Sequence, residues 1–270
     1  MSRFAIERIG DATLYLGDCL EVLPTLEPAH HVITDPPFEA EAHSLQRRSL
    51  GRGSEDGRRD IVSAALPFAA LDEQVRLTVA QEAVRLASGW VLAFCQAEAV
   101  SAWRVALEAA EAKYRRAMVW IKPDGMPQFT GDRPGMGYES IVCAWAGDGA
   151  SRWNGGGRHG VFTIPKHDAG NGHGGAPNPH PTTKPIRLMS ELVSLFSDHG
   201  QTILDPFMGS GTTGVAALKL GRSFVGIERE TAYFDIACKR IEEAWKQPRL
   251  FDEPKPKAEQ LSLIEGDANG

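Results

Sequence analysis

The chain has 270 residues, of which 42% are hydrophobic and 24% charged, and its formal net charge is −6 at pH 7. Length and composition fit one large α/β domain of a globular enzyme. No apolar run approaches the roughly 20 residues that cross a bilayer, and the N-terminus lacks a signal-peptide pattern, so we expect a cytoplasmic protein.

Short β-rich runs alternate with longer helical ones along the chain, which predicts a doubly wound α/β sheet. Strands are predicted at residues 12–16, 31–34, 90–94, 117–121, 141–145, 202–204 and 223–227. Helices are predicted at residues 71–87, 97–112, 185–197, 212–220 and 230–246. In the first helix Val75, Val79, Ala83 and Leu86 form one apolar stripe, as expected of a helix that lies on a sheet.

Three stretches lack a regular hydrophobic period. Residues 39–60 are polar and glycine-containing and predict a mobile loop, whereas 147–181 predict an insertion with little secondary structure. After Lys246 the composition turns to Pro, Lys, Glu and Gln, which predicts a disordered tail at 247–270. The folded domain is therefore expected to span residues 1–246.

Basic residues gather in the first two of these stretches. The net negative charge disfavours a nucleic-acid binder, whereas a locally basic cleft on a mildly acidic enzyme would still suit one. Two solvated loops with incidental arginines remain the alternative. The arginines that could contact a nucleic acid are Arg47, Arg48, Arg52, Arg58, Arg59, Arg152 and Arg158.

Neither a metal site nor a disulfide is predicted. The four cysteines lie far apart without a CxxC pair, so buried free thiols are expected. The histidines of the second irregular stretch have no standard ligand spacing, which favours loop residues or phosphate contacts. These histidines are His159, His167, His173 and His180.

A glycine-rich turn follows the predicted strand at 202–204. Gly209, Gly211 and Gly214 match G-x-G-x-x-G, a pattern that lets the backbone approach a nucleotide closely. Glu228 ends the next strand, where an acid can hold both ribose hydroxyls, and Asp205 would face a cationic amine. A helix start that merely needs small residues is the bland alternative. The missing Gly-Lys-Ser/Thr excludes a Walker phosphate loop, and the segment alone leaves a dinucleotide dehydrogenase open.

A second motif, Asp35-Pro-Pro-Phe38, ends the strand predicted at 31–34. Consecutive prolines fix φ and remove two backbone donors, so the carbonyls point in set directions. A purely structural strand stop is the alternative. Such a run is expected by chance in well under roughly 1% of chains of this size.

The chemistry of an exocyclic base amine explains these residue types. Its lone pair is delocalised into the ring, so it is a poor nucleophile. The Asp35 carboxylate and the Pro36 carbonyl can each accept one of its N–H bonds, which frees the lone pair for attack on a sulfonium methyl group. Phe38 offers a flat face on which a base flipped from the duplex can stack.

Together the two motifs resemble the DNA amino-methyltransferase family, which methylates adenine N6 or cytosine N4. Because the catalytic motif precedes the cofactor motif, the chain is similar to the circularly permuted branch, the β class. The resemblance covers residues 12–245. Further matching runs are YLGDC at 15–19, GWVLAF at 89–94, VWIK at 119–122, YESI at 138–141 and HPTTKP at 180–185.

The resemblance implies S-adenosylmethionine as cofactor and a Rossmann-like sheet, mostly parallel with one reversed strand. It places Asp18 at the cofactor's adenine, Glu228 at its ribose, and Thr182 and Lys184 at its carboxylate end. It assigns catalysis to Asp35, Pro36, Pro37 and Phe38, a position where relatives more often have Tyr. The other expected cofactor contacts are Cys19, Asp35, Asp205, Phe207, Gly209, Ser210, Gly211 and Thr212.

The same resemblance implies partners. Double-stranded DNA is the expected substrate, residues 147–181 its expected target-recognition insertion, and a homodimer the expected assembly. A bacterial or phage origin, nucleoid association and restriction-modification follow from the family. The tail sequences QPRLF at 247–251 and QLSLI at 260–264 resemble peptides that dock on the bacterial sliding clamp; packing of Leu250 and Phe251 on the last helix is the alternative.

Other transferases and one non-enzyme compete with adenine methylation. Cytosine-N4 enzymes usually have Ser where this chain has Asp35, so adenine is favoured. Cytosine C5 methylation needs a cysteine nucleophile, but Cys95 follows Phe94 on a predicted buried strand. Protein-glutamine methyltransferases typically begin the turn with Asn and carry the cofactor motif upstream. A catalytically silent DNA-binding module is the alternative of a different class.

Overall fold

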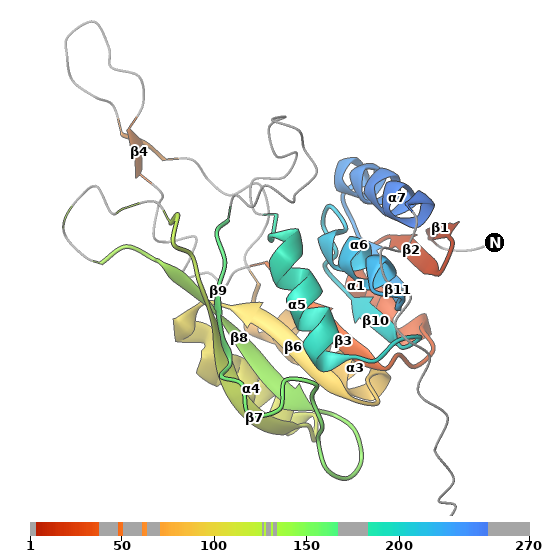
Figure 1. Cartoon of the computed structure of the whole chain (residues 1–270), viewed down its shortest axis with the longest axis horizontal. Helices are drawn as coiled ribbons and strands as arrows, with labels where there is room; N and C mark the ends of the chain where they lie inside the picture. The colour runs from red at the N-terminus through yellow and green to blue at the C-terminus, as the bar shows by residue number, and fades with distance from the viewer. Residues whose placement is uncertain are drawn as a thin grey trace, which may run out of the picture.

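The structure is a computed structural model that describes residues 4–37, 71–125, 127, 131, 134–166 and 183–247, together with the backbone of 48–50 and 61–63. The described residues form a nine-stranded sheet with helices on both faces (Figure 1). Its strand order is β1-β2-β11-β10-β3-β6-β8-β7-β9. The strands β4 (Arg48–Leu50) and β5 (Ile61–Ser63) pair antiparallel outside this sheet.

Seven strands were predicted, and all seven are present. They are β2 (Ala12–Leu16), β3 (His31–Thr34), β6 (Trp90–Cys95), β7 (Lys113–Ile121), β8 (Tyr138–Trp145), β10 (Thr202–Asp205) and β11 (Ser223–Glu228). Among these seven, only β8 is reversed, because it pairs antiparallel with both β6 and β7. The prediction of a mostly parallel sheet with one reversed strand is confirmed for this core.

Two edge strands escaped prediction. The strand β1 (Ala5–Ile9) pairs antiparallel with β2 and closes one edge of the sheet. At the other edge β9 (Val161–Thr163) pairs parallel with β7. Phe162 and Ile164 are buried in the core, so this part of the stretch at 147–181 belongs to the sheet rather than to an unstructured insertion.

All five predicted helices are present, and two short ones were not foreseen. The predicted helices are α3 (Glu73–Leu86), α4 (Val100–Ala109) with a preceding 3-10 turn η2 (Ala97–Ala99), α5 (Ile186–Phe196), α6 (Thr212–Lys219) and α7 (Thr231–Lys246). The short additions are α1 (Cys19–Val22) and the 3-10 turn η1 (Leu23–Thr25). Within the described ranges, no helix is long and apolar enough to cross a membrane.

The core has two layers because side chains alternate across the sheet. In β6, Leu92 and Phe94 pack with α5, α6 and α7 on one face, whereas Val91 and Ala93 pack with α3 and α4 on the other. Figure 1 shows the resulting sandwich, with α5 lying across one face of the sheet. Both faces of the central strands are therefore covered, which leaves the ends of the strands as the accessible part of the sheet.

Candidate active site

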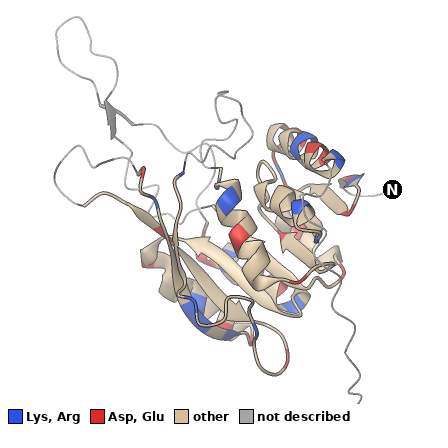
Figure 2. Cartoon of the chain, viewed as in Figure 1, with Lys and Arg blue, Asp and Glu red and all other residues tan. Residues whose placement is uncertain are grey.

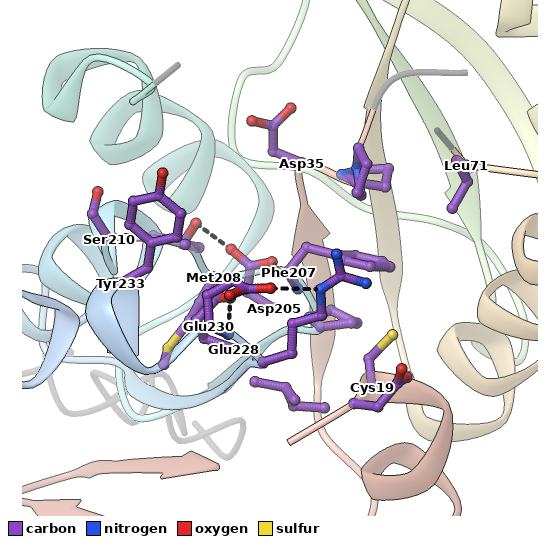
Figure 3. A pocket seen from close by; sticks show the side chains of 18 of the residues that line it. Cys19, Asp35, Leu71, Asp205, Phe207, Met208, Ser210, Glu228, Glu230 and Tyr233 are labelled. Carbon is purple, nitrogen blue, oxygen red and sulfur yellow. Dashed lines mark hydrogen bonds and ion pairs between the residues drawn. The ribbon is translucent and has the colours of Figure 1, made fainter. Parts of the chain in front are cut away.

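The candidate site lies where three neighbouring parallel strands end. Asp35 follows β3, Asp205 ends β10 and Glu228 ends β11, and these strands are adjacent in the sheet. Ligands of open α/β sheets bind at this carboxyl edge. A cavity of about 330 Å³ opens here, with Asp35 and Cys19 near opposite ends of the residues drawn in Figure 3.

Most of the predicted site residues meet at this cavity. Those that line it are Asp18, Cys19, Asp35, Pro36, Pro37, Lys184, Asp205, Phe207, Gly209, Ser210, Thr212 and Glu228. Gly211 lies in the same turn, next to two of them. Phe38 and Thr182 lie outside the described residues. Among the lining residues that were not predicted, Leu71 and the N-cap Asp72 directly precede α3, Val75 lies in its first turn, and Tyr233 lies in α7.

The glycine turn has the geometry that the motif predicts. Gly209 has φ +53° and Gly211 has φ +79°, both in the left-handed region that favours glycine. A Cβ on Gly209 would meet no atom within 4 Å, because this part of the turn borders the cavity. A Cβ on Gly214 would lie 2.6 Å from the Phe224 ring, so the third glycine allows α6 to pack closely on the sheet.

Arg240 of α7 fixes this turn and was missed by the sequence analysis. Its Nη1 donates to the Ser210 carbonyl at 2.6 Å, to Ser210 Oγ at 2.8 Å and to Thr212 Oγ1 at 3.1 Å. Burial lowers the pKa of Arg240. In the sequence this arginine lies among several charged residues of an amphipathic helix, and nothing distinguishes it from a solvated one.

Asp205 is buried and holds the turn through three hydrogen bonds. It accepts from Thr34 Oγ1 at 2.9 Å, from Thr213 Oγ1 at 2.6 Å and from the Phe207 backbone N–H at 3.1 Å. Burial raises its pKa to about 6, although these hydrogen bonds oppose the shift. Both carboxylate oxygens are thus bonded within the chain, and Asp205 also lines the cavity, so its role toward a cationic amine stays a prediction.

Two further acids border the cavity at strand and helix ends. Asp18 caps α1 by accepting from the Leu20 backbone N–H at 2.9 Å. Glu228 accepts from the Glu230 backbone N–H at 2.8 Å, and burial raises the pKa of Glu228. Acceptors of this kind suit a ligand with hydroxyl and amino donors, as predicted for a nucleoside.

The cavity thiol is not poised for nucleophilic catalysis. Burial raises the pKa of Cys19 to about 12, so the thiol stays protonated at neutral pH. Cys95 is buried on β6, as predicted for a core thiol. These observations agree with the expectation that cytosine C5 methylation is disfavoured.

Lys184 occupies a place that was not anticipated. Its Nζ lies 2.5 Å from Asp35 Oδ2 and 3.2 Å from Glu139 Oε2, and Glu139 Oε1 lies 2.6 Å from Lys122 Nζ. The family resemblance implies that Lys184 lies at the carboxylate end of the cofactor. In the structure its ammonium pairs with the candidate catalytic carboxylate and with a second acid, and its contact with the cofactor stays a prediction.

The predicted DNA-contacting arginines are mostly outside the part of the chain described here. Arg47, Arg52, Arg58 and Arg59 fall there, and of Arg48 only the backbone in β4 is described. Of the two remaining arginines, Arg158 pairs with Glu191 and lies 5.7 Å from the centre of the Phe162 ring, and Arg152 accepts at its carbonyl from Trp90 Nε1.

A basic group that was not predicted lies on β7. Lys113, Arg115 and Arg116 are exposed there, and Figure 2 shows basic residues on the lower part of this strand. Because β7 runs parallel to β3, the start of β7 lies at the end of the sheet opposite Asp35. This group is therefore remote from the candidate site.

Comparisons with known proteins place the site in context. Over 63 residues the chain is 52% identical to the type II methyltransferase M2.DpnII of Streptococcus pneumoniae, a match that covers 23% of this chain and 24% of that relative. The chain thus aligns with about a quarter of the length of this curated relative.

Solved structures share the fold over most of their length. A complex of M1.HpyAVI with S-adenosylmethionine has a TM-score of 0.63 at 24% identity, covering 85% of this chain and 98% of that one. The cytosine-N4-specific PvuII DNA methyltransferase has a TM-score of 0.65 at 15% identity, covering 86% of each chain. At these identities the likeness concerns the fold.

The sequence model of the N6_N4 DNA methylases matches residues 29–239. This span includes the Asp-Pro-Pro turn at 35–37, Lys184 and Glu139, and the glycine turn. It also includes Glu228. Members of this family take the methyl group from S-adenosylmethionine. The chain therefore belongs to the N6_N4 family of DNA methylases.

Proposed function

We propose that the protein transfers a methyl group from S-adenosylmethionine to adenine N6 in double-stranded DNA. The observation that carries the proposal is the state of the Asp35 carboxylate. Its Oδ2 is paired with Lys184, whereas Oδ1 is buried and, among the described residues, has no hydrogen-bond partner. A buried acceptor without a partner is costly unless a ligand donates to it.

The residues around the cavity fit S-adenosylmethionine. Phe207, Leu71 and Val75 offer apolar surface for a purine ring, and the acid Glu228 suits a ribose diol. The backbone of the turn at Gly209 is open to the cavity and allows close approach of the methionine part. The free volume of about 330 Å³ is within the range of small-molecule sites.

The chain's own groups would activate the target amine. When bound, the cofactor supplies an electrophilic methyl group on a sulfonium centre. The Asp35 carboxylate would accept one amine N–H and the Pro36 carbonyl the other, so that the nitrogen lone pair turns toward the methyl group. After the transfer the methylated amine would carry a surplus proton, for which the Asp35 carboxylate is the neighbouring acceptor. Phe38, outside the described residues, is proposed to stack on the flipped base.

Adenine is preferred to cytosine because the turn begins with an acid. A charged carboxylate is a stronger acceptor than the serine hydroxyl usual in cytosine-N4 enzymes, and the resemblance to adenine enzymes rests on this residue. Cytosine N4 is the second candidate, because the TM-score of 0.65 to a cytosine-N4-specific methyltransferase is about the same as the 0.63 to M1.HpyAVI. Both bases present an amine beside a ring nitrogen, so the Asp35 chemistry suits either.

The partners remain proposals. The arginines between Arg47 and Arg59 are proposed to contact DNA phosphates, and replacement of all five by Gln is expected to flatten the salt dependence of DNA binding. Residues 147–181 are proposed to hold the target-recognition contacts, although β9 gives part of this stretch a structural role. A homodimer and sliding-clamp binding by residues 247–270 are proposed on the resemblance alone.

A single experiment separates these functions. The protein is incubated with radiolabelled S-adenosylmethionine and unmethylated duplex DNA, and the DNA is digested to nucleosides and analysed by mass spectrometry. Label in N6-methyladenine supports the proposal, and label in N4-methylcytosine transfers it to the second candidate. Binding of cofactor and DNA without any transfer would identify a silent DNA-binding module.

A further inference from the structure

Four charged side chains form a continuous row beneath the candidate catalytic turn. Asp35, Lys184, Glu139 and Lys122 alternate in sign and are linked by contacts of 2.5, 3.2 and 2.6 Å. Lys184 is 7% exposed, and the side chains of Glu139 and Lys122 are 11% and 10% exposed. As a unit the row carries no net charge, which is how buried charges are normally tolerated.

The topology explains why these residues meet. Asp35 follows β3, and Lys122 follows β7, which runs parallel to β3. Glu139 lies near the start of β8, and because β8 is reversed its start lies at the same edge of the sheet. Lys184 precedes α5 and lies 5.0 Å from the centre of the Phe94 ring at the end of β6.

We propose that Lys184, held by Glu139, is the positioning residue that aims Asp35 at the target amine and keeps it ionised. The inference rests on the proposed function. By taking Asp35 Oδ2, the ammonium fixes the rotamer of a carboxylate that lines the cavity, while Oδ1 is buried and has no hydrogen-bond partner among the described residues. Lys122 in turn pairs with Glu139 and fixes its position. Each side chain of the row is thus held in place by the next one.

The electrostatics agree with this role. The pKa of Asp35 is raised overall, chiefly by burial; Lys184 is the strongest influence that opposes the rise, and Glu139 adds to it. Burial alone would lower the pKa of Lys184, but the two carboxylates outweigh it and raise the pKa overall. Of the two lysines in the row, Lys184 lowers the pKa of Asp35 more than Lys122 does, so it is the cation that most favours the ionised carboxylate.

The role assigned by the sequence resemblance makes a different prediction. If Lys184 held the cofactor carboxylate, its loss would weaken cofactor binding without altering the ionisation of Asp35. If it only stabilised the fold, its loss would lower the melting temperature and leave the pH profile of the surviving activity unchanged. A positioning role predicts a changed pH profile with unchanged cofactor binding.

The test measures the rate of methyl transfer against pH for the full-length protein and its Lys184→Met variant, with cofactor Kd by calorimetry. The acidic limb of the rate is expected to move up by about 1–3 pH units, because Asp35 protonates more easily without its cation. Lys184→Arg should restore part of the original profile. The matched control is Lys246→Met, which removes an exposed lysine–glutamate pair of 2.7 Å on α7 and should change neither quantity.

A second measurement does not depend on activity. Lys184→Met leaves Asp35, whose side chain is 26% exposed, without its cation and should lower the melting temperature by several degrees. In an Asp35→Asn background that carboxylate is absent, so the same change should cost less. Additive losses would refute the pairing even if no methyl transfer occurs in any variant.

An unshifted pH limb in an active Lys184→Met enzyme, or a weakened cofactor Kd alone, would refute the positioning role and leave the proposed function standing.

Discussion

Replacing Asp205 by Asn should change how stability depends on pH. The native carboxylate is buried, and burial raises its pKa to about 6, above its ordinary value of 3.8. Between these values the folded chain holds a proton that the unfolded chain has released. The free energy of unfolding contributed by Asp205 therefore falls as pH rises through about 6, and is then constant.

The magnitude follows from the size of the shift. One pKa unit corresponds to about 1.4 kcal/mol, so a group with a native pKa of about 6 loses roughly that amount between about pH 5 and pH 8. Asparagine is nearly isosteric and has no proton to exchange. Its Oδ1 can keep the bonds from Thr34 and Phe207, and its Nδ2 can donate to Thr213.

The assay is urea unfolding of both proteins at the two pH values. The stability of Asp205→Asn relative to the native chain is expected to improve by about 1.4 kcal/mol from about pH 5 to pH 8. Calorimetry should also show that cofactor affinity survives, if Asp205 acts by holding the turn rather than by its charge. An equal stability difference at both pH values would refute the reasoning, because it would mean that the native carboxylate does not titrate in this range.

Three further changes test other parts of the site. Asp35→Ala should abolish methyl transfer in a radiolabel assay while calorimetry shows a cofactor Kd within about tenfold of native, since most proposed cofactor contacts lie elsewhere. Arg240→Met removes three hydrogen bonds to the turn around Ser210 and should weaken cofactor binding by about tenfold or more; an unchanged Kd would contradict its anchoring role. Gly214→Ala places a Cβ 2.6 Å from the Phe224 ring and should lower the free energy of unfolding by about 1–3 kcal/mol, as measured in urea; a neutral effect would mean that the helix can shift.

Sequence reasoning located the strands and helices because their hydrophobic patterns are strong. The strand β6 reads WVLAFC, apolar throughout, as a strand covered on both faces should be. The edge strands failed for the opposite reason. In β1 (AIERI) and β9 (VFT) few residues are buried, so composition alone does not distinguish them from loops. Only the pairing with β2 and with β7 makes them strands.

The site was predictable wherever local chain geometry fixes it. The glycine turn follows one strand and the two prolines follow another, and each motif restricts the backbone strongly. Gly209 and Asp35 were therefore predicted correctly as residues at the cavity, together with the residues next to them in sequence. The place of Asp205 at the cavity was predicted, but its hydrogen bonds were not. Its hydrogen bonds depend on Thr34, 171 residues away along the chain, and on Thr213 of the following helix.

The pairing of Lys184 could not be read from the sequence because a lysine's charge fits either of two acidic ligands. Lys184 lines the same cavity as Asp35, and spacing along the chain does not say whether its charge pairs with Asp35 or with a ligand. The reversed strand β8 decides the matter, since it brings Glu139 to the same edge and makes the lysine a bridge between two acids. Removal of the Glu139 carboxylate should therefore make the position of Lys184 less fixed, and it should affect Asp35 only indirectly, through Lys184. If Glu139→Gln moved the acidic limb of the rate as far up in pH as Lys184→Met does, the order of this row would be wrong, because loss of a like charge should instead make Asp35 easier to ionise.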